Sequence, residues 1–242
     1  HYPVYLVDQP RRGQAGQSTV AAELSATPDD QFWYAQFRIG VYPNMNDGVA
    51  FPKDPAAQAQ FFRMMTPDTG SFDVGVITDS MSQLFAKTGD GVFVTHSAGG
   101  IIGWTTAMAS DKVQGIIAIE PGAFYFPEGE APPKLESKFG DVSPLTVPPE
   151  QFAKLTRIPI VIYFGDFIPA HLDGTQGGEQ WHIRMKMAQQ FVDTVNKHGG
   201  KAELVHLPKV GIKGNTHFLF SDLNNAQIAD HIAHWLHEKG LD

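Results

Sequence analysis

Four short apolar runs, rich in β-branched residues, most constrain the fold of this chain. They lack the strict polar alternation of a sheet with one solvated face, so we expect strands that are covered on both faces, as in a parallel sheet. Helical patterns separate the runs, and this alternation predicts an α/β fold with right-handed crossovers. The predicted strands are residues 4–8, 91–96, 115–120 and 158–166, with a weaker one at 201–207, and the predicted helices are residues 76–87, 100–110, 179–198 and 223–239.

Composition narrows the class of protein further. With 42% hydrophobic residues among 242, the chain can bury a full core, and we expect a single domain over residues 1–242. The 18 basic and 26 acidic residues give a net charge of -8 without a dense basic cluster, which argues against a nucleic-acid partner. No stretch approaches the ~18 consecutive apolar residues of a membrane span, so we expect no membrane partner. Since cysteine is absent, disulfides, thiolate metal sites and cysteine nucleophiles are excluded.

Two long segments, about residues 20–75 and 121–157, interrupt the alternation and are rich in glycine, proline and aromatic residues. Insertions of this length in a compact domain usually form lids or binding walls. Aromatic side chains line apolar pockets, so Phe32, Trp33 and Phe124 are candidate residues of a substrate pocket. The alternative is that these aromatic side chains fold back onto the core.

The sequence T-H-S-A-G at residues 95–99 places one serine between a predicted strand and a predicted helix. It matches the G-x-S-x-G signature of a nucleophile elbow, except that Thr95 replaces the first glycine. A serine at such a sharp turn has its hydroxyl lifted clear of the sheet. Ser97 is therefore the candidate nucleophile, and the backbone N–H of Ala98 is a candidate oxyanion-hole donor. The alternative is that Ser97 caps the helix.

A serine hydroxyl becomes a good nucleophile when a base takes its proton. His217 lies in a glycine-rich loop between the last predicted strand and the last predicted helix. In hydrolases that have this kind of elbow, the chain order is serine, acid, histidine, and this order places the base in that loop. His96 directly precedes Ser97, and strand alternation points its side chain away from the nucleophile, so we expect it to pack or to shape the pocket.

Histidines elsewhere in the chain give weaker signals. His231, His234 and His237 recur every three residues on the C-terminal helix, but this spacing spreads them over too wide an arc to bind one metal ion. We expect a solvated helix face there, and a protein that needs no metal and no cofactor. His171 and His182 flank a glycine-rich loop and are interpreted as loop or pocket-edge residues.

Two carboxylates are candidates for the third member of the triad, which must fix the tautomer of the histidine and stabilise its cation. Glu120 ends the predicted strand 115–120, and Asp166 ends the predicted strand 158–166. Either residue could simply cap its strand at a polar edge of the sheet. The strand-end position alone leaves the choice between them open.

Five blocks of the sequence resemble a small group of bacterial α/β-hydrolase esterases. The blocks are VYLVDQPRRGQAGQS, THSAGGI, AIEPG, IPIVIYFGD and GNTHFLFSDLNNAQIADHIAHWL, which occur in the right order and span nearly the whole chain. The resemblance implies the α/β-hydrolase fold, with a mostly parallel sheet and helices on both faces. It also implies a triad of Ser97, His217 and Glu120, because this group takes its acid from the strand after the nucleophile helix. Asp166 would then have a supporting or structural role.

The resemblance raises further expectations. In this fold the strand that resembles residues 4–8 follows earlier strands and a loop that donates the second oxyanion-hole N–H. Those strands are missing from the chain, so we expect an upstream segment of the same protein to complete the fold and to supply that donor. The resemblance also suggests a secreted or periplasmic protein, and it leaves open whether the chain forms a homodimer.

Together these features predict a serine hydrolase that cleaves a small-molecule carboxylic ester. Ser97 would attack the carbonyl, His217 would pass the proton to the leaving alcohol, and Glu120 would orient His217. The same fold and triad permit a lactonase or another acyl or carbon–carbon bond hydrolase. A catalytically silent binding module that keeps the pocket is the alternative outside enzymes.

Overall fold

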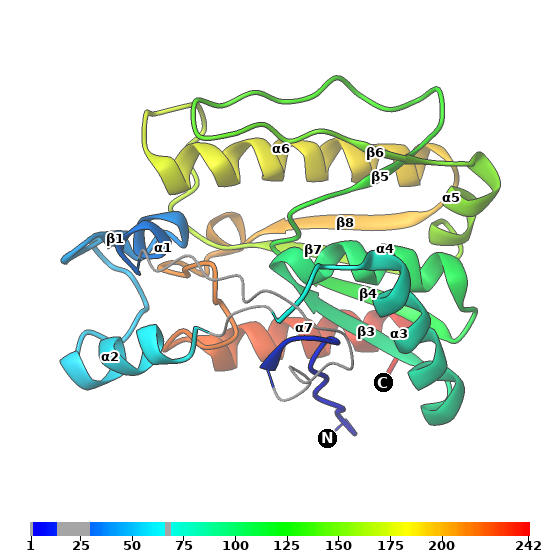
Figure 1. Cartoon of the computed structure of the whole chain (residues 1–242), viewed down its shortest axis with the longest axis horizontal. Helices are drawn as coiled ribbons and strands as arrows, with labels where there is room; N and C mark the ends of the chain where they lie inside the picture. Colours follow the sequence, from blue (N-terminus) through cyan, green and yellow to red (C-terminus); the bar gives the residue numbers. More distant parts are fainter. Residues whose placement is uncertain (1, 14–29, 66–68) are drawn as a thin grey trace.

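A four-stranded parallel sheet lies at the centre of the computed structural model, which describes residues 2–13, 30–65 and 69–242. The strands run in the order β3-β4-β7-β8, and their register aligns the last residues of neighbouring strands. The carboxyl ends of the four strands therefore lie together at one end of the sheet, and the residues that follow the strands meet there. Figure 1 shows the arrangement of these strands. The strands are β3 (Gly91–His96), β4 (Val113–Ile119), β7 (Pro159–Phe164) and β8 (Lys201–His206).

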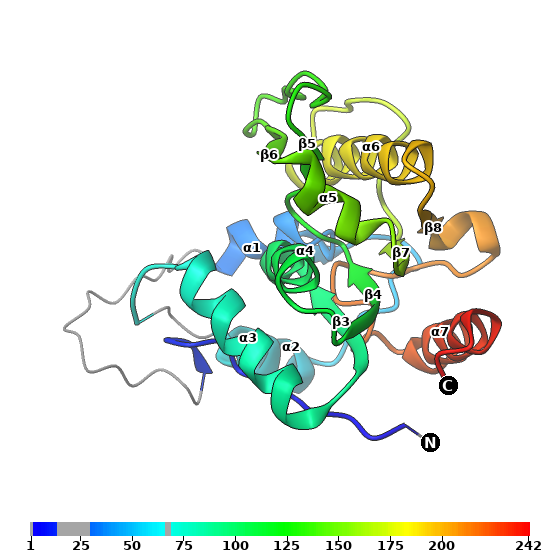
Figure 2. The same ribbon diagram turned by 90° about the vertical axis from the view of Figure 1, so that its right-hand side faces the viewer.

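Helices cover both faces of this sheet. On β4, Ile116 and Ala118 contact the cluster that includes Trp104 and Phe191, whereas Ile117 faces the opposite cluster with α7. Figures 1 and 2 show α7 on one side of the sheet and α4 and α6 on the other. Burial on both faces explains why the central strands β4 and β7 are continuous apolar runs. The edge strand β3 is less covered than predicted, since Val94 is 54% exposed. The helices are α3 (Val74–Thr88), α4 (Gly100–Ala109), α5 (Pro149–Leu155), α6 (Gln176–Lys197) and α7 (Asn225–Lys239).

The predicted α/β architecture is confirmed, but the predicted strand at residues 4–8 is wrong. Residues 2–9 have no regular secondary structure, and the side chain of Leu6 is 96% exposed. A strand needs a neighbour to satisfy its backbone N–H and C=O groups. In the described part of the chain, no strand is hydrogen-bonded to this run, and β3 and β8 form the two edges of the central sheet.

The two segments predicted as long insertions contain more regular structure than their composition indicates. Residues 20–29 and 66–68 of the first lie outside the described residues. Its remainder contains α1 (Asp30–Gln36), the pair β1 (Gly40–Val41) and β2 (Asn44–Met45), and α2 (Pro55–Arg63), and these elements form a small apolar cluster of their own. The second contains α5 and a short parallel pair, β5 (Tyr125–Pro127) and β6 (Leu145–Val147).

Within residues 2–13, 30–65 and 69–242, no helix has both the length and the apolar composition that crossing a bilayer requires.

Candidate active site

Ser97 occupies a sharp turn between strand β3 and helix α4. It begins the single-turn 3-10 helix η2 (Ser97–Gly99), which runs directly into α4. Its φ of 54° lies in the left-handed region, which a non-glycine residue rarely adopts. The backbone N–H of Gly122 donates to the Ser97 carbonyl at 3.2 Å, so the turn is tied to the segment that follows β4. This is the backbone geometry of a nucleophile elbow.

Small residues on α4 make room for this turn. A Cβ on Gly100 would lie 2.5 Å from the Cβ of Pro121, and one on Gly103 would lie 3.0 Å from Cγ2 of Thr95. Thr95 is nearly buried and stands where the motif usually has glycine. The absence of a side chain at Gly103 therefore accommodates the departure from the motif at Thr95.

A buried histidine and a buried carboxylate meet beside this turn. Nδ1 of His217 lies 2.6 Å from Oε2 of Glu120, and both side chains are essentially inaccessible to solvent. The other oxygen, Oε1, accepts the backbone N–H of Gly165 at 2.7 Å. Nε2 of His217 is buried and has no hydrogen-bond partner among the described residues. One nitrogen of the ring is thus held by Glu120, while the other stays free to accept a proton.

Arg38 is not among the residues that the sequence pattern predicts for the site. It follows α1 closely, is 3% exposed, and pairs through Nη2 with Oε1 of Glu120. Its Nε donates to the backbone carbonyl of Asp166 at 2.8 Å. The signal in the sequence is a lone arginine within the aromatic and apolar run of residues 32–41, because a charge buried there needs a partner.

Burial and charge set the protonation states of the pair. Burial lowers the pKa of His217 below its usual value of 6.5, and Arg38 and Arg184 act in the same direction, against the attraction of Glu120. Burial by itself would raise the pKa of Glu120, but the charge of Arg38 and the hydrogen bond from His217 outweigh it and lower the pKa to about 2. At neutral pH the site therefore holds a neutral imidazole and an ionised carboxylate.

Aromatic rings fix the plane of the histidine. The ring of His217 stacks on Phe37 at a centroid distance of 5.0 Å and an angle of 11°, and it lies 4.3 Å from the ring of Trp181. The backbone N–H of His217 also donates to the carbonyl of Phe37 at 3.1 Å. Both the backbone and the ring of His217 are thereby held by the turn after α1.

A second buried carboxylate holds the loop that carries His217. Asp222 accepts the backbone N–H and the hydroxyl of Thr216 at 2.8 and 2.9 Å, and the side-chain amide of Asn215 at 3.2 Å. Burial raises the pKa of Asp222 to about 6, against the effect of these hydrogen bonds. The loop is therefore fixed immediately before His217 in the chain.

Asp166, the other candidate acid, has different partners. Its carboxylate accepts the backbone N–H of Gly214 at 2.8 Å and that of Phe167 at 2.7 Å. It is half-buried, and its backbone N–H donates to the carbonyl of Asn215. Of the two strand-end carboxylates, Glu120 contacts His217 and Asp166 holds the loop.

The predicted pocket residues lie in different surroundings. Phe32, 39% exposed, contacts Trp33 edge-to-face at 5.0 Å, and Trp33 stacks on Phe37 at 5.2 Å. A series of rings thus leads from the surface to His217. Phe124 is fully buried against Trp104 and Phe191, so it is a core residue and the pocket interpretation fails for it.

The expectation that His96 points away from the nucleophile's side is also wrong. Its ring lies 4.3 Å from the ring of His217, and its Nε2 contacts the backbone carbonyl of His217 at 3.0 Å. Burial lowers the pKa of His96 to about 3, and the proximity of His217 adds to this effect. The backbone of His96 is ordinary extended strand, with φ -134° and ψ 138°, so its side chain follows the strand alternation. The loop that carries His217 packs against the side to which His96 points. His96 packs against the candidate base as a neutral ring.

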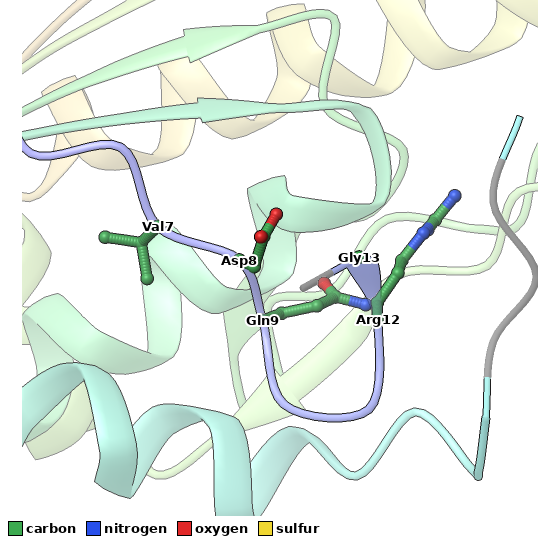
Figure 3. A pocket seen from close by; sticks show the side chains of 5 residues that line it. All are labelled: Val7, Asp8, Gln9, Arg12 and Gly13. Atoms are coloured by element: carbon green, nitrogen blue, oxygen red, sulfur yellow. The ribbon is translucent and has the colours of Figure 1, made fainter. Parts of the chain in front are cut away.

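A hollow of about 260 Å³ lies elsewhere, in the N-terminal segment. Figure 3 shows the side chains that line it, and neither Ser97 nor His217 is among them. This hollow therefore does not mark the substrate pocket of the candidate site. Its lining residues are Val7, Asp8, Gln9, Arg12 and Gly13.

The histidines of the C-terminal helix have separate partners. His231 contacts the hydroxyl of Tyr163 at 2.9 Å, and the other two, His234 and His237, lie within 3.1 Å of Glu238 and 2.7 Å of Asp242. In the part of the chain that the structure describes, no three histidine or carboxylate side chains come together in a way that would hold a metal ion. Of the two loop histidines, His171 is exposed, and Nδ1 of His182 contacts the backbone carbonyl of Pro169 at 2.9 Å.

Comparisons with known proteins bear on the fold and the class of protein, although no protein-family model matches the chain. The sequence is 24% identical over 271 residues to the Probable secreted lipase phiG of a fungal species (strain ATCC 74256), and the match covers 98% of this chain and 73% of that lipase. The structure is similar to that of a bacterial esterase solved at atomic resolution, with a TM-score of 0.71 and 29% sequence identity. That match covers 93% of this chain but 62% of the esterase, so this chain spans less than two thirds of the esterase's length.

The sheet order, the turn at Ser97 and these likenesses define the class of protein. The chain has the α/β-hydrolase fold, as the sequence blocks predict. Its resemblance to bacterial esterases of that fold is confirmed as well.

Proposed function

We propose that the protein hydrolyses carboxylic esters through an acyl-enzyme on Ser97. The observation that carries this proposal is the buried pair of His217 and Glu120. Nε2 of His217 has no partner among the described residues, and the His217 ring lies 4.3 Å from that of His96, which directly precedes the strained turn at Ser97. Strained backbone at a non-glycine residue clusters at functional sites. The names of the two similar proteins, a lipase and an esterase, support the same chemistry.

Each residue has one task in this mechanism. Ser97 Oγ attacks the ester carbonyl while Nε2 of His217 takes its proton, and the same nitrogen then returns the proton to the leaving alcohol. Glu120 holds the Nδ1–H tautomer and stabilises the imidazolium that forms. The backbone N–H of Ala98 donates to the oxyanion. Water then attacks the acyl carbonyl while His217 takes its proton, and His217 returns that proton to Ser97 Oγ as the bond to the acid breaks.

The test is the intact mass of the folded protein after exposure to a fluorophosphonate, followed by peptide mapping. We expect a single adduct on Ser97 in the wild type and none in Ser97→Ala. His217→Ala should leave the serine in place but slow labelling strongly, because the base is lost. An adduct on a different residue, or none on a folded sample, would overturn the proposal, and the second result would favour a silent binding module.

The leaving group is tested separately with a panel of aryl esters, alkyl esters and lactones. We expect aryl and alkyl esters to be cleaved with higher kcat/KM than lactones. A preference for lactones would keep Ser97 as nucleophile but assign the protein to a different group of acyl hydrolases.

We also propose that the protein is exported from the cell that makes it. The support is the fungal relative, which is described as secreted. Locating the native protein in cell-associated and culture-medium fractions tests this. Recovery in the cytosolic fraction alone would overturn it.

A further inference from the structure

We propose that Arg38 is a positioning residue for this reaction: its guanidinium fixes the Glu120 carboxylate, and through it His217, in the arrangement that the base requires. This inference rests on the function proposed above. It goes beyond that function because it assigns a task to a residue outside the serine, histidine and acid.

The two oxygens of Glu120 have separate partners. Oε1 is held by Nη2 of Arg38 and by the backbone N–H of Gly165. Oε2 is thereby left to His217. Because both sides of the carboxylate are engaged, it cannot rotate without breaking a charge-assisted hydrogen bond. The geometry at Oε2 is thus set by contacts made at Oε1.

Arg38 is itself anchored independently of Glu120. Its Nε donates to the Asp166 carbonyl at 2.8 Å, its own carbonyl accepts the side-chain amide of Asn46 at 2.8 Å, and its guanidinium lies 5.3 Å from the centre of the Trp181 ring. Two donors of one planar guanidinium therefore bridge the residues that follow β4 and β7. A lysine ammonium is a compact charge and has no rigid planar arrangement of donors that could hold both residues.

The surrounding chain is adapted to this arginine. The φ of Arg38 is 61°, so Arg38 shares the left-handed conformation of Ser97 and Glu120. A Cβ on Gly177 of α6 would lie 3.1 Å from Cγ of Arg38 and 2.2 Å from the carbonyl of Ala35. Replacing a buried ion pair by apolar residues is often neutral or stabilising, so stability alone does not explain a strained, fully buried arginine.

The charge of Arg38 predicts a signature in the pH profile. Arg38 lowers the pKa of both Glu120 and His217. Without it the carboxylate and imidazole take up a proton at higher pH, and the base is lost earlier on acidification. The other charged or titratable groups around the pair are Arg184 of α6, His96 of β3, His206 of β8, and Asp166 and Asp222 of the adjoining loops.

The experiment compares Arg38→Gln and Arg38→Lys with Arg63→Gln, which removes an exposed arginine at the end of α2. The readouts are the pH profile of kcat/KM for an aryl ester and the NMR titration of the His217 ring, assigned through its loss in His217→Asn. In Arg38→Gln we expect the acid limb to move up by at least about one pH unit, with the His217 titration moving the same way. We also expect a fall of at least about ten-fold in kcat/KM on the plateau.

Arg38→Lys keeps the positive charge but removes the planar guanidinium that bonds to both Glu120 and Asp166. It should keep the acid limb within about half a pH unit of wild type, because the charge remains. It should still lower kcat at an unchanged KM, because the bridge between Glu120 and Asp166 is lost. If Arg38→Gln does not fold, Arg38→Lys decides: a wild-type kcat in that variant would overturn the proposal.

A purely structural role gives another pattern. Arg38→Gln would then lower the melting temperature while leaving the acid limb and the His217 titration where they are in wild type. That result would overturn the proposal. Failure of the wild type to react with a fluorophosphonate would instead overturn the proposed function, and the NMR titration would still report whether Arg38 controls His217.

Discussion

Two carboxylates follow neighbouring strands of the same sheet, yet they have different surroundings. Glu120, after β4, is fully buried and bonds to the side chains of Arg38 and His217. Asp166, after β7, is half-buried, and its carboxylate accepts backbone N–H groups from Phe167 and Gly214. The position at the end of a parallel strand places each carboxylate at the carboxyl end of the sheet. The groups that bind the carboxylate there determine its role.

Gly165 separates the two environments. It is the residue between β7 and Asp166, and a Cβ there would lie 3.0 Å from Oε1 of Glu120 and 2.7 Å from the carbonyl of Thr216. The absent side chain leaves the space that the Glu120 carboxylate fills. Gly165, the residue next to Asp166, therefore leaves the space in which the Glu120 carboxylate lies.

The largest effect should come from Glu120→Gln. Removing the charge leaves Arg38 unpaired and no longer selects the Nδ1–H tautomer of His217, so we expect kcat/KM to fall by roughly 10³ to 10⁴. Steady-state kinetics on an aryl ester measures this. A loss smaller than that of Asp166→Asn would transfer the role of triad acid to Asp166.

Gly165→Ala should have the next largest effect. The added Cβ would collide with the backbone carbonyls of Asn215 and Thr216, which cannot move without displacing His217. We expect kcat/KM to fall about 100-fold and the free energy of unfolding to fall by about 1–3 kcal/mol. Gly75→Ala on α3 is the matched control, because its Cβ would meet only an ordinary 3.4 Å contact. Equal behaviour of the two variants would contradict the role of Gly165.

Asp166→Asn should change turnover least. The substitution weakens the hydrogen bonds to Gly214 and Phe167 but leaves the contact between Glu120 and His217 intact. We expect less than about a ten-fold loss of kcat/KM and a loss of stability of about 1 kcal/mol. A thermal melt recorded beside the kinetics checks both numbers, and a loss of 10³-fold would remove the distinction between the two acids.

The last difference between the two acids concerns the pH dependence of stability and not turnover. The pKa of Glu120 is about 2 in the folded protein and lies near 4.5 in the unfolded chain, so the unfolded chain binds more protons between these values. Its contribution, about 1–3 kcal/mol, is present above pH 4.5 and is lost as the pH falls toward 2. Urea melts from pH 5 to 2.5 should show a flatter dependence in Glu120→Gln than in Asp166→Asn. Equal slopes would contradict the assignment.

The sequence predicts the elements that depend on local pattern. The run around residues 158–166 is a strand that helices cover on both faces, and its apolar composition reflects that burial. The run around residues 91–96 is also a strand, but it lies at the edge of the sheet and leaves Val94 54% exposed. The run at residues 4–8 has the same composition but no neighbouring strand in the described chain, and local pattern cannot reveal a missing partner.

The site is predictable in part for a similar reason. Ser97 and His217 belong to motifs that are contiguous in the chain, so their neighbours in sequence identify them. The partner of Glu120 is Arg38, which lies 82 positions away. No spacing rule connects an arginine after one helix to a glutamate after a distant strand. The contact depends on how α1 packs against α6, which only the tertiary structure specifies.

The turn that follows α1 has a consequence for how this sequence can vary. Consecutive residues there serve different parts of the site: the carbonyl of Gln36 accepts the indole N–H of Trp181, that of Phe37 accepts the N–H of His217, and Arg38 pairs with Glu120. Inserting or deleting one residue at Phe37 would shift Arg38 by one position relative to Gln36, so the three contacts could no longer form together. Insertions and deletions, which surface loops usually tolerate, would therefore be selected against at this turn.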